Sequence, residues 1–356
     1  MNRLDRGKVN RIAVRLPNWL GDAVMATPAL QTLHQVYPNA SLTILVRENL
    51  SELFVSCSFV EEVIPLPKVS GVSKASEVFG IASNLRRKKL DLALCFPHSF
   101  SSALIFWLAG IPHRAGFSAE DRKMFLTLSL PYPLDGERPH RVGFYGQLVE
   151  LIAGQKLAVP PLKVWPRELE KEAKAALEKK IGGFQNLVTV APGSVGPAKR
   201  WFAERYAEIV KKLIREKKAR VVLVGAPNDR PSSEEVACLS GISPVNLAGE
   251  TSLSEVYFLF QKSQLFLGND SGAGHLAAAA GIPVVILAGA GDPDEISPWT
   301  DEKTVLFKKI FCSPCYRNVC RRKDHPLECL DLIEVEAVWQ AVGSWLKKSE
   351  RPVDAV

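Results

Sequence analysis

The segment NDSGAGHL, residues 269–276 of this 356-residue chain, combines groups that suit the binding of an anion. It follows an apolar run and precedes an alanine-rich run, so we expect it to join a buried strand to a buried helix. Gly272 and Gly274 would let a ligand approach the backbone, and Ser271 could cap the helix. The first amides of such a helix, together with its dipole, favour a phosphate group.

Two further side chains of this segment have distinct roles in the predicted phosphate site. His275 stands in the first helical turn and could donate a hydrogen bond to the anion. Asp270 would repel a phosphate, so we expect it to orient the loop through backbone N–H groups instead. The alternative is a capped strand–helix turn that binds no ligand.

A second glycine-rich loop, APGSVGPAKRW at residues 191–201, adds positive charge. Ser194 and the glycines beside it offer hydrogen-bond donors in a flexible turn. Lys199 is a compact charge that could offset the negative charge developing on a leaving phosphate. The alternative is an ordinary surface pair formed by Lys199 and Arg200.

A third loop, VRLPNWLGDAV at residues 14–24, carries a carboxylate where the first strand of the chain should end. Asp22 is either a helix N-cap or a general base that takes a proton from a substrate. Asn18 and Trp19 would line the mouth of the binding cleft beside Asp22. An exposed tryptophan is costly unless it packs on the core or on a ligand.

Weaker signals follow in the second half of the chain. The loop VGAPNDRPSSEE, residues 224–235, places Asp229 and Glu234 near a strand end, where either could bind ribose hydroxyls. Thr251 is a further candidate for nucleoside contact by position alone. Solvent-facing carboxylates are the alternative for Asp229 and Glu234.

The elements that must position these loops alternate between strand and helix. Strands are predicted at 11–16, 41–46, 60–66, 91–96, 113–117, 186–192, 219–227, 244–249, 264–270 and 283–289. Helices are predicted at 22–36, 202–215, 231–240, 252–262, 273–280 and 334–348. Such alternation is typical of an α/β fold with parallel sheets covered on both faces.

The alternation is interrupted by a proline-rich and then strongly charged stretch near residue 155, and it restarts afterwards. We therefore expect two doubly wound domains, 1–160 and 161–333, and a C-terminal helix within 334–356 that could pack back on the N-terminal domain. Ligands of such sheets bind outside the carboxyl ends of the strands, which places the chemistry in a cleft faced by both sheets. An acid in one half and a cationic anion site in the other suit transfer from a phosphate-activated donor.

Composition narrows the class of protein. The chain has 45 Lys and Arg against 38 Asp and Glu, a formal charge of +7, which suits an anionic partner or reflects a basic solvated surface. The N-terminus lacks the apolar core of a secretory signal, and no window is long and apolar enough for a membrane span. We expect a cytoplasmic protein whose contact with a membrane, if any, is peripheral.

Three motifs in order, PNWLGDAVMATPAL, PGSVGPAKRW and NDSGAGHLAAAAGIPVV, resemble the ADP-heptose–lipopolysaccharide heptosyltransferases of glycosyltransferase family 9, in particular their heptosyltransferase II branch. The resemblance covers nearly the whole chain. It implies a GT-B fold of two Rossmann-like domains, with the acceptor in the first and the nucleotide sugar in the second. It implies an inverting, metal-independent transfer of L-glycero-D-manno-heptose from ADP-heptose to the inner-core heptose of lipopolysaccharide, on the cytoplasmic face of the inner membrane and without nucleic acid.

The resemblance also assigns roles to residues. Asp22 matches the proposed general base, Lys199 matches the lysine at the diphosphate, and Ser194 lies in the same loop. The donor-side motif is matched by Asp270, Ser271, Gly272, Gly274 and His275. Basic residues of the first half could meet the phosphorylated acceptor: Arg114, Arg122, Lys123 and Arg141. The run RRKK at 86–89 could touch an anionic membrane, although a solvated helix end is the simpler interpretation.

Four of the seven cysteines, Cys312, Cys315, Cys320 and Cys329, form a C-x2-C-x4-C-x8-C cluster, with His325 nearby. The spacing suits a structural zinc, and reduced thiols or a loop disulfide are the alternatives. A similar cysteine-rich segment belongs to the resemblance, which implies no catalytic metal or cofactor.

Other functions compete with this assignment. Gly272-x-Gly274-x-x-Ala277 partly meets the dinucleotide fingerprint, which would fit an NAD-dependent oxidoreductase, although the motif comes late in the chain. A non-catalytic nucleotide- or lipid-binding protein would not depend on Asp22. Another GT-B glycosyltransferase with a different nucleotide sugar shares the same fold, since the fold does not fix the sugar.

Overall fold

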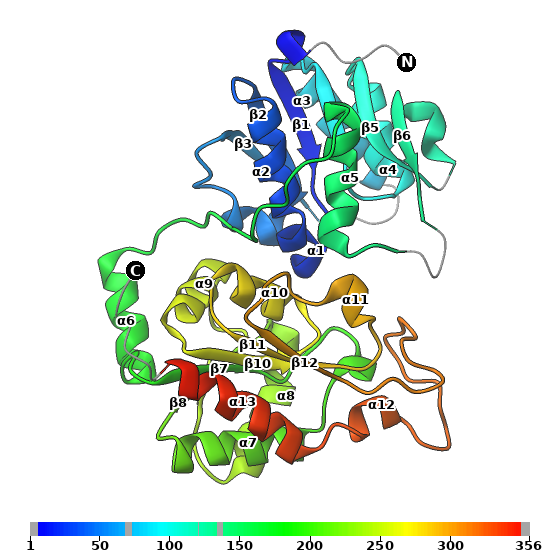
Figure 1. Cartoon of the computed structure of the whole chain (residues 1–356). Coiled ribbons are helices and arrows are strands. Elements are labelled where there is room, and N and C mark those ends of the chain that lie inside the picture. The colour runs from blue at the N-terminus through cyan, green and yellow to red at the C-terminus, as the bar shows by residue number, and fades with distance from the viewer. Residues whose placement is uncertain (1–5, 68–72, 120, 134–137, 350–356) are drawn as a thin grey trace. The chain divides into compact units, whose positions relative to one another are not determined.

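The computed structural model describes residues 6–67, 73–119, 121–133 and 138–349, and the chain divides into two compact units (Figure 1). The first unit is Met1–Arg167 and the second is Glu168–Val356. The division falls a few residues after the expected boundary at 160, because the proline-rich stretch before α6 (Lys171–Ile181) continues the first unit. Each unit is described by itself below.

The first unit contains one parallel sheet of six strands. Its order is β3-β2-β1-β4-β5-β6. The strands are β1 (Arg11–Arg15), β2 (Ser41–Arg47), β3 (Val60–Leu66), β4 (Leu92–Cys95), β5 (His113–Ser118) and β6 (Leu128–Pro131). Its helices are α1 (Leu20–Met25), α2 (Thr27–Val36), α3 (Ser73–Arg87), α4 (Phe100–Leu108) and α5 (Arg141–Ala153).

The central strands are apolar along most of their length because helices cover both faces of the sheet. β1 and β4 are buried at every position except Arg11. The structure differs from the sequence prediction in three respects. Helices α3, α4 and α5 were not among the predicted helices. The helix expected at 22–36 is split at Ala26, since Pro28 can start α2 but cannot continue α1. The edge strand β6 was not predicted, because it is short and only partly buried.

The second unit repeats this plan, with the order β12-β11-β10-β7-β8-β9. The strands are β7 (Leu187–Ala191), β8 (Arg220–Leu223), β9 (Val245–Asn246), β10 (Leu265–Asn269), β11 (Val284–Ala288) and β12 (Lys303–Phe307), of which β12 was not predicted. The helices are α6, α7 (Ala203–Glu216), α8 (Arg230–Ser240), α9 (Leu253–Lys262), α10 (Gly272–Ala279), α11 (Pro293–Ile296), α12 (Glu328–Asp331) and α13 (Val335–Ser349).

Both sheets reverse their strand order at one point, which is where ligands of doubly wound folds bind. In the first unit the reversal lies between β1 and β4, and in the second it lies between β7 and β10. The loops that leave β1, β7 and β10 are the three that the sequence singled out for chemistry. The predicted α/β architecture of two Rossmann-like halves is therefore confirmed.

The last helix belongs to the core of the second unit. Val338, Val342 and Leu346 of α13 pack with Trp201 and Leu330, and α13 runs beside α7 (Figure 1). This differs from the expectation that residues 334–356 could pack on the N-terminal domain. The apolar stripe of α13 is used within the second unit instead. Among the described residues, no helix combines the length and apolar character needed to cross a membrane.

A single buried carboxamide joins the loops at the point where the strand order of the second sheet reverses, between β7 and β10. We call this point the switch point. Asn269, the last residue of β10, is fully buried. Its Nδ2 donates to the carbonyl of Pro192 at 2.8 Å and to that of Gly193 at 3.3 Å. Its Oδ1 accepts from the Trp201 backbone N–H at 3.0 Å and from the Tyr206 hydroxyl at 2.9 Å. The loop after β7 and the start of α7 are thereby fixed to the end of β10.

We expect Asn269→Ala to lower the free energy of unfolding by about 3 kcal/mol, because it leaves buried donors and acceptors without partners. Urea denaturation followed by tryptophan fluorescence measures the loss. The control Asn228→Ala removes an exposed carboxamide from the same unit and should change stability by less than about 0.5 kcal/mol. Equal effects of the two substitutions would contradict the role given to Asn269.

Candidate active site

Asp22 lies in the first turn of α1, at the loop that leaves β1. Its Oδ1 accepts a hydrogen bond from the Tyr145 hydroxyl of α5 at 3.0 Å. Trp19 occupies the N-cap position of α1, so the N-cap interpretation of Asp22 does not apply. A carboxylate held by a side chain of another helix, at the carboxyl edge of the sheet, is placed to accept a proton.

Tyr145 is buried, and two causes hold its pKa well above the ordinary value for tyrosine. Burial is the larger cause, and the negative charge of Asp22 is the second. Tyr145 therefore remains a protonated donor throughout the neutral range and keeps Asp22 in one orientation. The sequence analysis overlooked Tyr145, because it lies 123 residues from Asp22 in a helix that was not predicted.

The loop between β1 and α1 is shaped by a buried arginine that sequence reasoning also overlooked. Arg15, at the end of β1, donates to the Leu16 carbonyl and to Asn18 Oδ1. Burial lowers the pKa of Arg15 to about 10. The signal was visible in the sequence as an arginine within an apolar strand, RIAVRL. Asn18 and Trp19 are both exposed in the loop beyond it.

The four basic acceptor candidates separate into two groups. Arg141 is the first residue of α5, and its charge acts on Tyr145, so it lies beside the Asp22–Tyr145 pair. Lys123 is exposed in η3 (Arg122–Phe125). Both remain candidates for contact with an anionic acceptor.

Arg114 and Arg122 serve the fold instead. The Arg122 side chain is 0 % exposed and donates to the carbonyls of Phe117, Pro97 and Ser99. Arg114 stands near the start of β5 and donates to the Phe125 and Ile111 carbonyls. The expectation that they meet an acceptor does not fit this placement, because Arg122 is fully buried and Arg114 directs two of its nitrogens at backbone carbonyls.

In the second unit, Lys199 and Asp270 form an ion pair at the switch point. Lys199 Nζ lies 2.7 Å from Asp270 Oδ2, and the side chains are 24 % and 9 % exposed. Lys199 ends the turn after β7, and Asp270 follows β10, so the pair bridges the two loops flanking the reversal. Asp270 orients a cation here, whereas the sequence analysis expected it to orient its own loop through backbone amides.

Arg200, the second basic residue in the loop after β7, donates hydrogen bonds to the backbone of the same loop. Arg200 donates to the Ser194 carbonyl through Nε at 2.9 Å and Nη2 at 2.7 Å, and Ser194 is buried. The alternative of a solvated surface pair is therefore excluded for Lys199 and Arg200, since each has a specific partner. Arg200 gives the loop its shape, and Lys199 keeps a partly exposed ammonium group.

Helix α10 begins beside this ion pair. Ser271 is at its N-cap position, but within the described part of the chain its side chain makes no capping bond. Gly272 is the first helical residue, and His275 is buried one turn later. A Cβ on Gly274 would lie 2.7 Å from Ile286 Cδ1, so this glycine allows α10 to pack on β11. Close packing of the helix, more than access for a ligand, explains Gly274.

Asp229, a candidate for contact with the nucleoside, packs against the glycines that follow β7 and β8. A Cβ on Gly193 would lie 2.3 Å from the Asp229 carboxyl carbon, and one on Gly225 would lie 2.8 Å from its Cβ. Asp229 also accepts from the Ala226 N–H at 3.0 Å. Thr251 lies just before α9, and its buried hydroxyl has no hydrogen-bond partner among the described residues.

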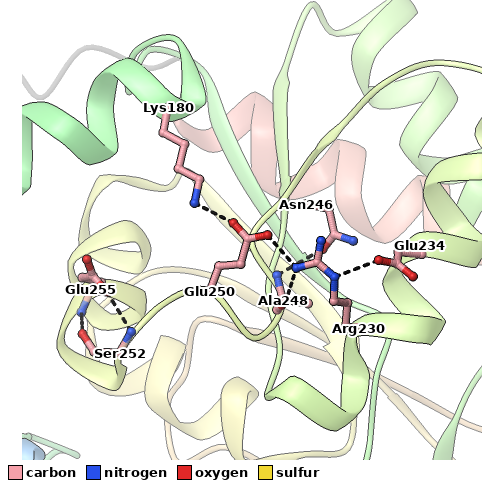
Figure 2. Close-up of polar contacts among 8 residues, drawn as sticks. All are labelled: Lys180, Arg230, Glu234, Asn246, Ala248, Glu250, Ser252 and Glu255. Carbon is pink, nitrogen blue, oxygen red and sulfur yellow. Dashed lines mark hydrogen bonds and ion pairs between the residues drawn. The ribbon is translucent and has the colours of Figure 1, made fainter.

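Glu234 belongs to a charge network at the ends of β8 and β9, shown in Figure 2. Arg230 pairs with Glu234 at 2.8 Å and with Glu250 at 2.5 Å, and Lys180 of α6 pairs with Glu250 at 2.6 Å. Hydrogen bonds from Lys180 first, and then from Arg230, lower the pKa of Glu250 to about 2. The Glu234 carboxylate is held by Arg230, so it fits the bracing of this loop better than the binding of ribose.

The four clustered cysteines are free thiols in the structure. Burial first, and then the neighbouring thiols, raise the pKa of Cys329. Nowhere in the described residues are three or more His, Cys, Asp or Glu side chains placed to hold a metal ion.

Comparison with known proteins gives the family. Residues 78–325 match the family described as glycosyltransferase family 9 (heptosyltransferase). Lipopolysaccharide heptosyltransferase 2 of Salmonella typhimurium is 33% identical over 309 residues, which are 83% of this chain and 87% of that protein. The protein of the same name from Escherichia coli is 32% identical over the same shares of both chains.

Solved structures agree with this match. The structure of E. coli ADP-heptose lps heptosyltransferase II superposes with a TM-score of 0.77 and 28% identity, and it covers 96% of this chain and 100% of that one. A glycosyltransferase family 9 structure from Veillonella parvula gives a TM-score of 0.82 at 22% identity, covering 95% and 97%, and supports the fold alone. The oxidoreductase alternative is therefore wrong: the chain belongs to glycosyltransferase family 9, and it is a heptosyltransferase with the GT-B fold.

Proposed function

We propose that this heptosyltransferase transfers L-glycero-D-manno-heptose from ADP-heptose to a heptose of the lipopolysaccharide inner core. The relatives named lipopolysaccharide heptosyltransferase 2 and the structure named for ADP-heptose support this donor and acceptor. The observation that carries the proposal is the Lys199–Asp270 pair beside the start of α10, because it offers a positioned cation and helix amides to a diphosphate.

In the proposed reaction, Asp22 accepts the proton of an acceptor hydroxyl as that oxygen attacks the anomeric carbon of the donor. The new C–O bond forms as the bond from the anomeric carbon to the diphosphate oxygen breaks, so the configuration inverts and ADP leaves. The Tyr145 hydroxyl holds Asp22 in position through the 3.0 Å hydrogen bond. In place of a metal, Lys199 and the first amides of α10 supply positive charge to the leaving diphosphate in this proposal.

Lys199 would exchange partners in this cycle. Without a donor, Asp270 holds the ammonium group at 2.7 Å. A bound diphosphate brings more negative charge and draws Lys199 toward the amides of Gly272 and its neighbours, with Ser194, Ser271 and His275 around it. Asp229 and Thr251 are the candidates for the nucleoside, because they lie on loops at the ends of neighbouring strands.

On the acceptor side, we assign Asn18, Trp19, Lys123 and Arg141 to the sugar and phosphate groups of the core. The first two are exposed in the loop before Asp22, Lys123 is exposed in η3, and Arg141 begins α5, the helix that carries Tyr145. The acceptor is carried by a lipid, so we place the enzyme in the cytoplasm and at the cytoplasmic face of the inner membrane.

A direct assay tests the proposal. Purified protein is incubated with ADP-heptose and a truncated core acceptor, and heptose transfer and ADP release are measured, with and without a chelator. UDP- and GDP-sugars test the alternative of another GT-B enzyme. Transfer from one of those sugars, and not from ADP-heptose, would overturn the assignment of the donor; a rate that falls on chelation would overturn metal independence.

We expect Asp22→Asn to lower kcat by about 10²- to 10⁴-fold, because the amide cannot accept the proton. Binding of ADP, measured by calorimetry, should be nearly unchanged, since Asp22 belongs to the first unit. The control Glu61→Gln removes an exposed carboxylate from β3 and should leave both quantities unchanged. An Asp22→Asn variant with full activity would favour a non-catalytic binding protein or a different base.

Tyr145→Phe should move the acid limb of the kcat/KM profile to higher pH by about 1 unit, because a hydrogen bond to the charged carboxylate is lost. The raised pKa of Tyr145 keeps the wild-type donor protonated over this range, so the shift is not due to tyrosine ionisation. Tyr257→Phe removes a hydroxyl that donates to the Ala279 carbonyl in the second unit, and its profile should match the wild type.

Lys199→Ala should lower kcat by about 10²- to 10³-fold and weaken ADP binding, because one positioned cation is lost at the diphosphate. Steady-state kinetics and calorimetry separate the two effects. Lys211→Ala removes an exposed lysine of α7 from the same unit, and it should behave as wild type. Unchanged ADP affinity in Lys199→Ala would place the diphosphate elsewhere.

A further inference from the structure

Large apolar side chains are exposed together along α4 of the first unit. Phe100 and Trp107 are 43% and 48% exposed, and their spacing of seven residues puts them on one side of the helix. Phe125 of η3 packs between them, with ring centres 5.1 Å from Phe100 and 5.5 Å from Trp107. Met124, the preceding residue, is 73% exposed. We call this surface, together with Phe79, the aromatic surface.

Phe79 extends the aromatic surface onto α3. It is 62% exposed and lies with Phe100 and Leu104 in the wall of an open hollow of about 390 Å³. The hollow lies between the first turns of α3 and α4. Because these helices follow parallel strands, their first turns stand at the carboxyl edge of the sheet, the same edge at which α1 carries Asp22.

Cations accompany the aromatic surface. Lys123 precedes Met124 and is exposed. Arg86 of α3 is exposed and donates at 2.6 Å to the carbonyl of Leu108, the residue after Trp107. Two carboxylates stand nearby: Asp121 is exposed beside Lys123, and Glu77 is half-buried, where its charge acts on Arg15. Exposed aromatic and sulfur side chains flanked by Lys and Arg have the chemistry of a peripheral membrane site.

We propose that the aromatic surface docks this enzyme on an anionic lipid bilayer, with Phe79, Phe100, Trp107 and Met124 entering the headgroup region and Arg86 and Lys123 contacting lipid phosphates. This deepens the proposed function, on which it rests for its purpose: the Phe79 and Phe100 end of the surface lies at the edge of the sheet that carries Asp22, and an acceptor anchored in that bilayer would be met there. A tryptophan with one apolar and one polar end is suited to this interface.

Co-sedimentation with lipid vesicles tests the proposal without any transfer reaction. The wild type should sediment with phosphatidylethanolamine–phosphatidylglycerol vesicles, much less with neutral phosphatidylcholine vesicles, and less at high salt. Phe79→Ser/Met124→Ser should lower the partition coefficient at least about fivefold, because two exposed anchors are lost. Leu239→Ser, which removes a 53% exposed leucine from α8, is the matched control and should sediment as wild type.

A second measurement guards against misfolding of the double variant. Brominated lipids should quench tryptophan fluorescence, and Trp107→Phe, which keeps a ring against Phe125, should remove part of that quenching. Trp299→Phe, at a 38% exposed tryptophan of the second unit, should not. Wild-type sedimentation of the double variant, or no binding to anionic vesicles, would overturn the proposal. Self-association lost in the double variant without vesicle binding would also overturn it, in favour of a second copy of the chain.

Vesicle binding and transfer can fail separately. If anionic vesicles bind through the aromatic surface but no heptose is transferred, the docking site stands and the proposed donor or acceptor is wrong. If heptose reaches a water-soluble acceptor but the aromatic surface binds no vesicle, the function stands and the docking site is wrong.

Discussion

The buried carboxamide of Asn269 is the constraint on which the loops at the strand reversal of the second unit depend. It spans the switch point of the second sheet and satisfies four backbone or hydroxyl groups that would otherwise be buried without partners. The loop that carries Lys199 is fixed on one side of it, and Asp270 follows it directly in the chain. The 2.7 Å ion pair can form only because these two segments are held in register.

In each unit a neighbouring side chain holds one of the two residues proposed to react. Tyr145 holds Asp22, and Asp270 holds Lys199. Asp22 accepts a hydrogen bond from a phenol that stays neutral, an arrangement that suits the proton transfer proposed for this carboxylate. Lys199 is held by a carboxylate, so the charges of this pair balance in the structure, and the proposed diphosphate would take the place of that carboxylate. Exchange of one anionic partner for another costs less than creating an unpaired, half-buried cation. Loops at the same edge of two similar sheets thus hold an anionic side chain in one unit and a cationic side chain in the other.

Most strands and the loop positions of the candidate site residues were predictable because their signals are local. Apolar runs of strand length, with glycine and polar residues directly after them, are enough to place Asp22, Lys199 and the 269–276 segment at strand ends. The short edge strands β6 and β12 were not found, since half-buried strands of four or five residues lack a strong pattern.

Residue roles that depend on distant partners could not be obtained this way. Arg122 looks in sequence like a surface cation, yet backbone carbonyls from two other segments surround it. Tyr145 and Asn269 gain their importance from partners 123 and up to 77 residues away. A buried arginine, tyrosine or asparagine is tolerated only where its donors and acceptors find partners, and that matching is a property of the folded chain. Arg122 shows this most clearly, because it is fully buried and its donors are turned to groups of its own unit.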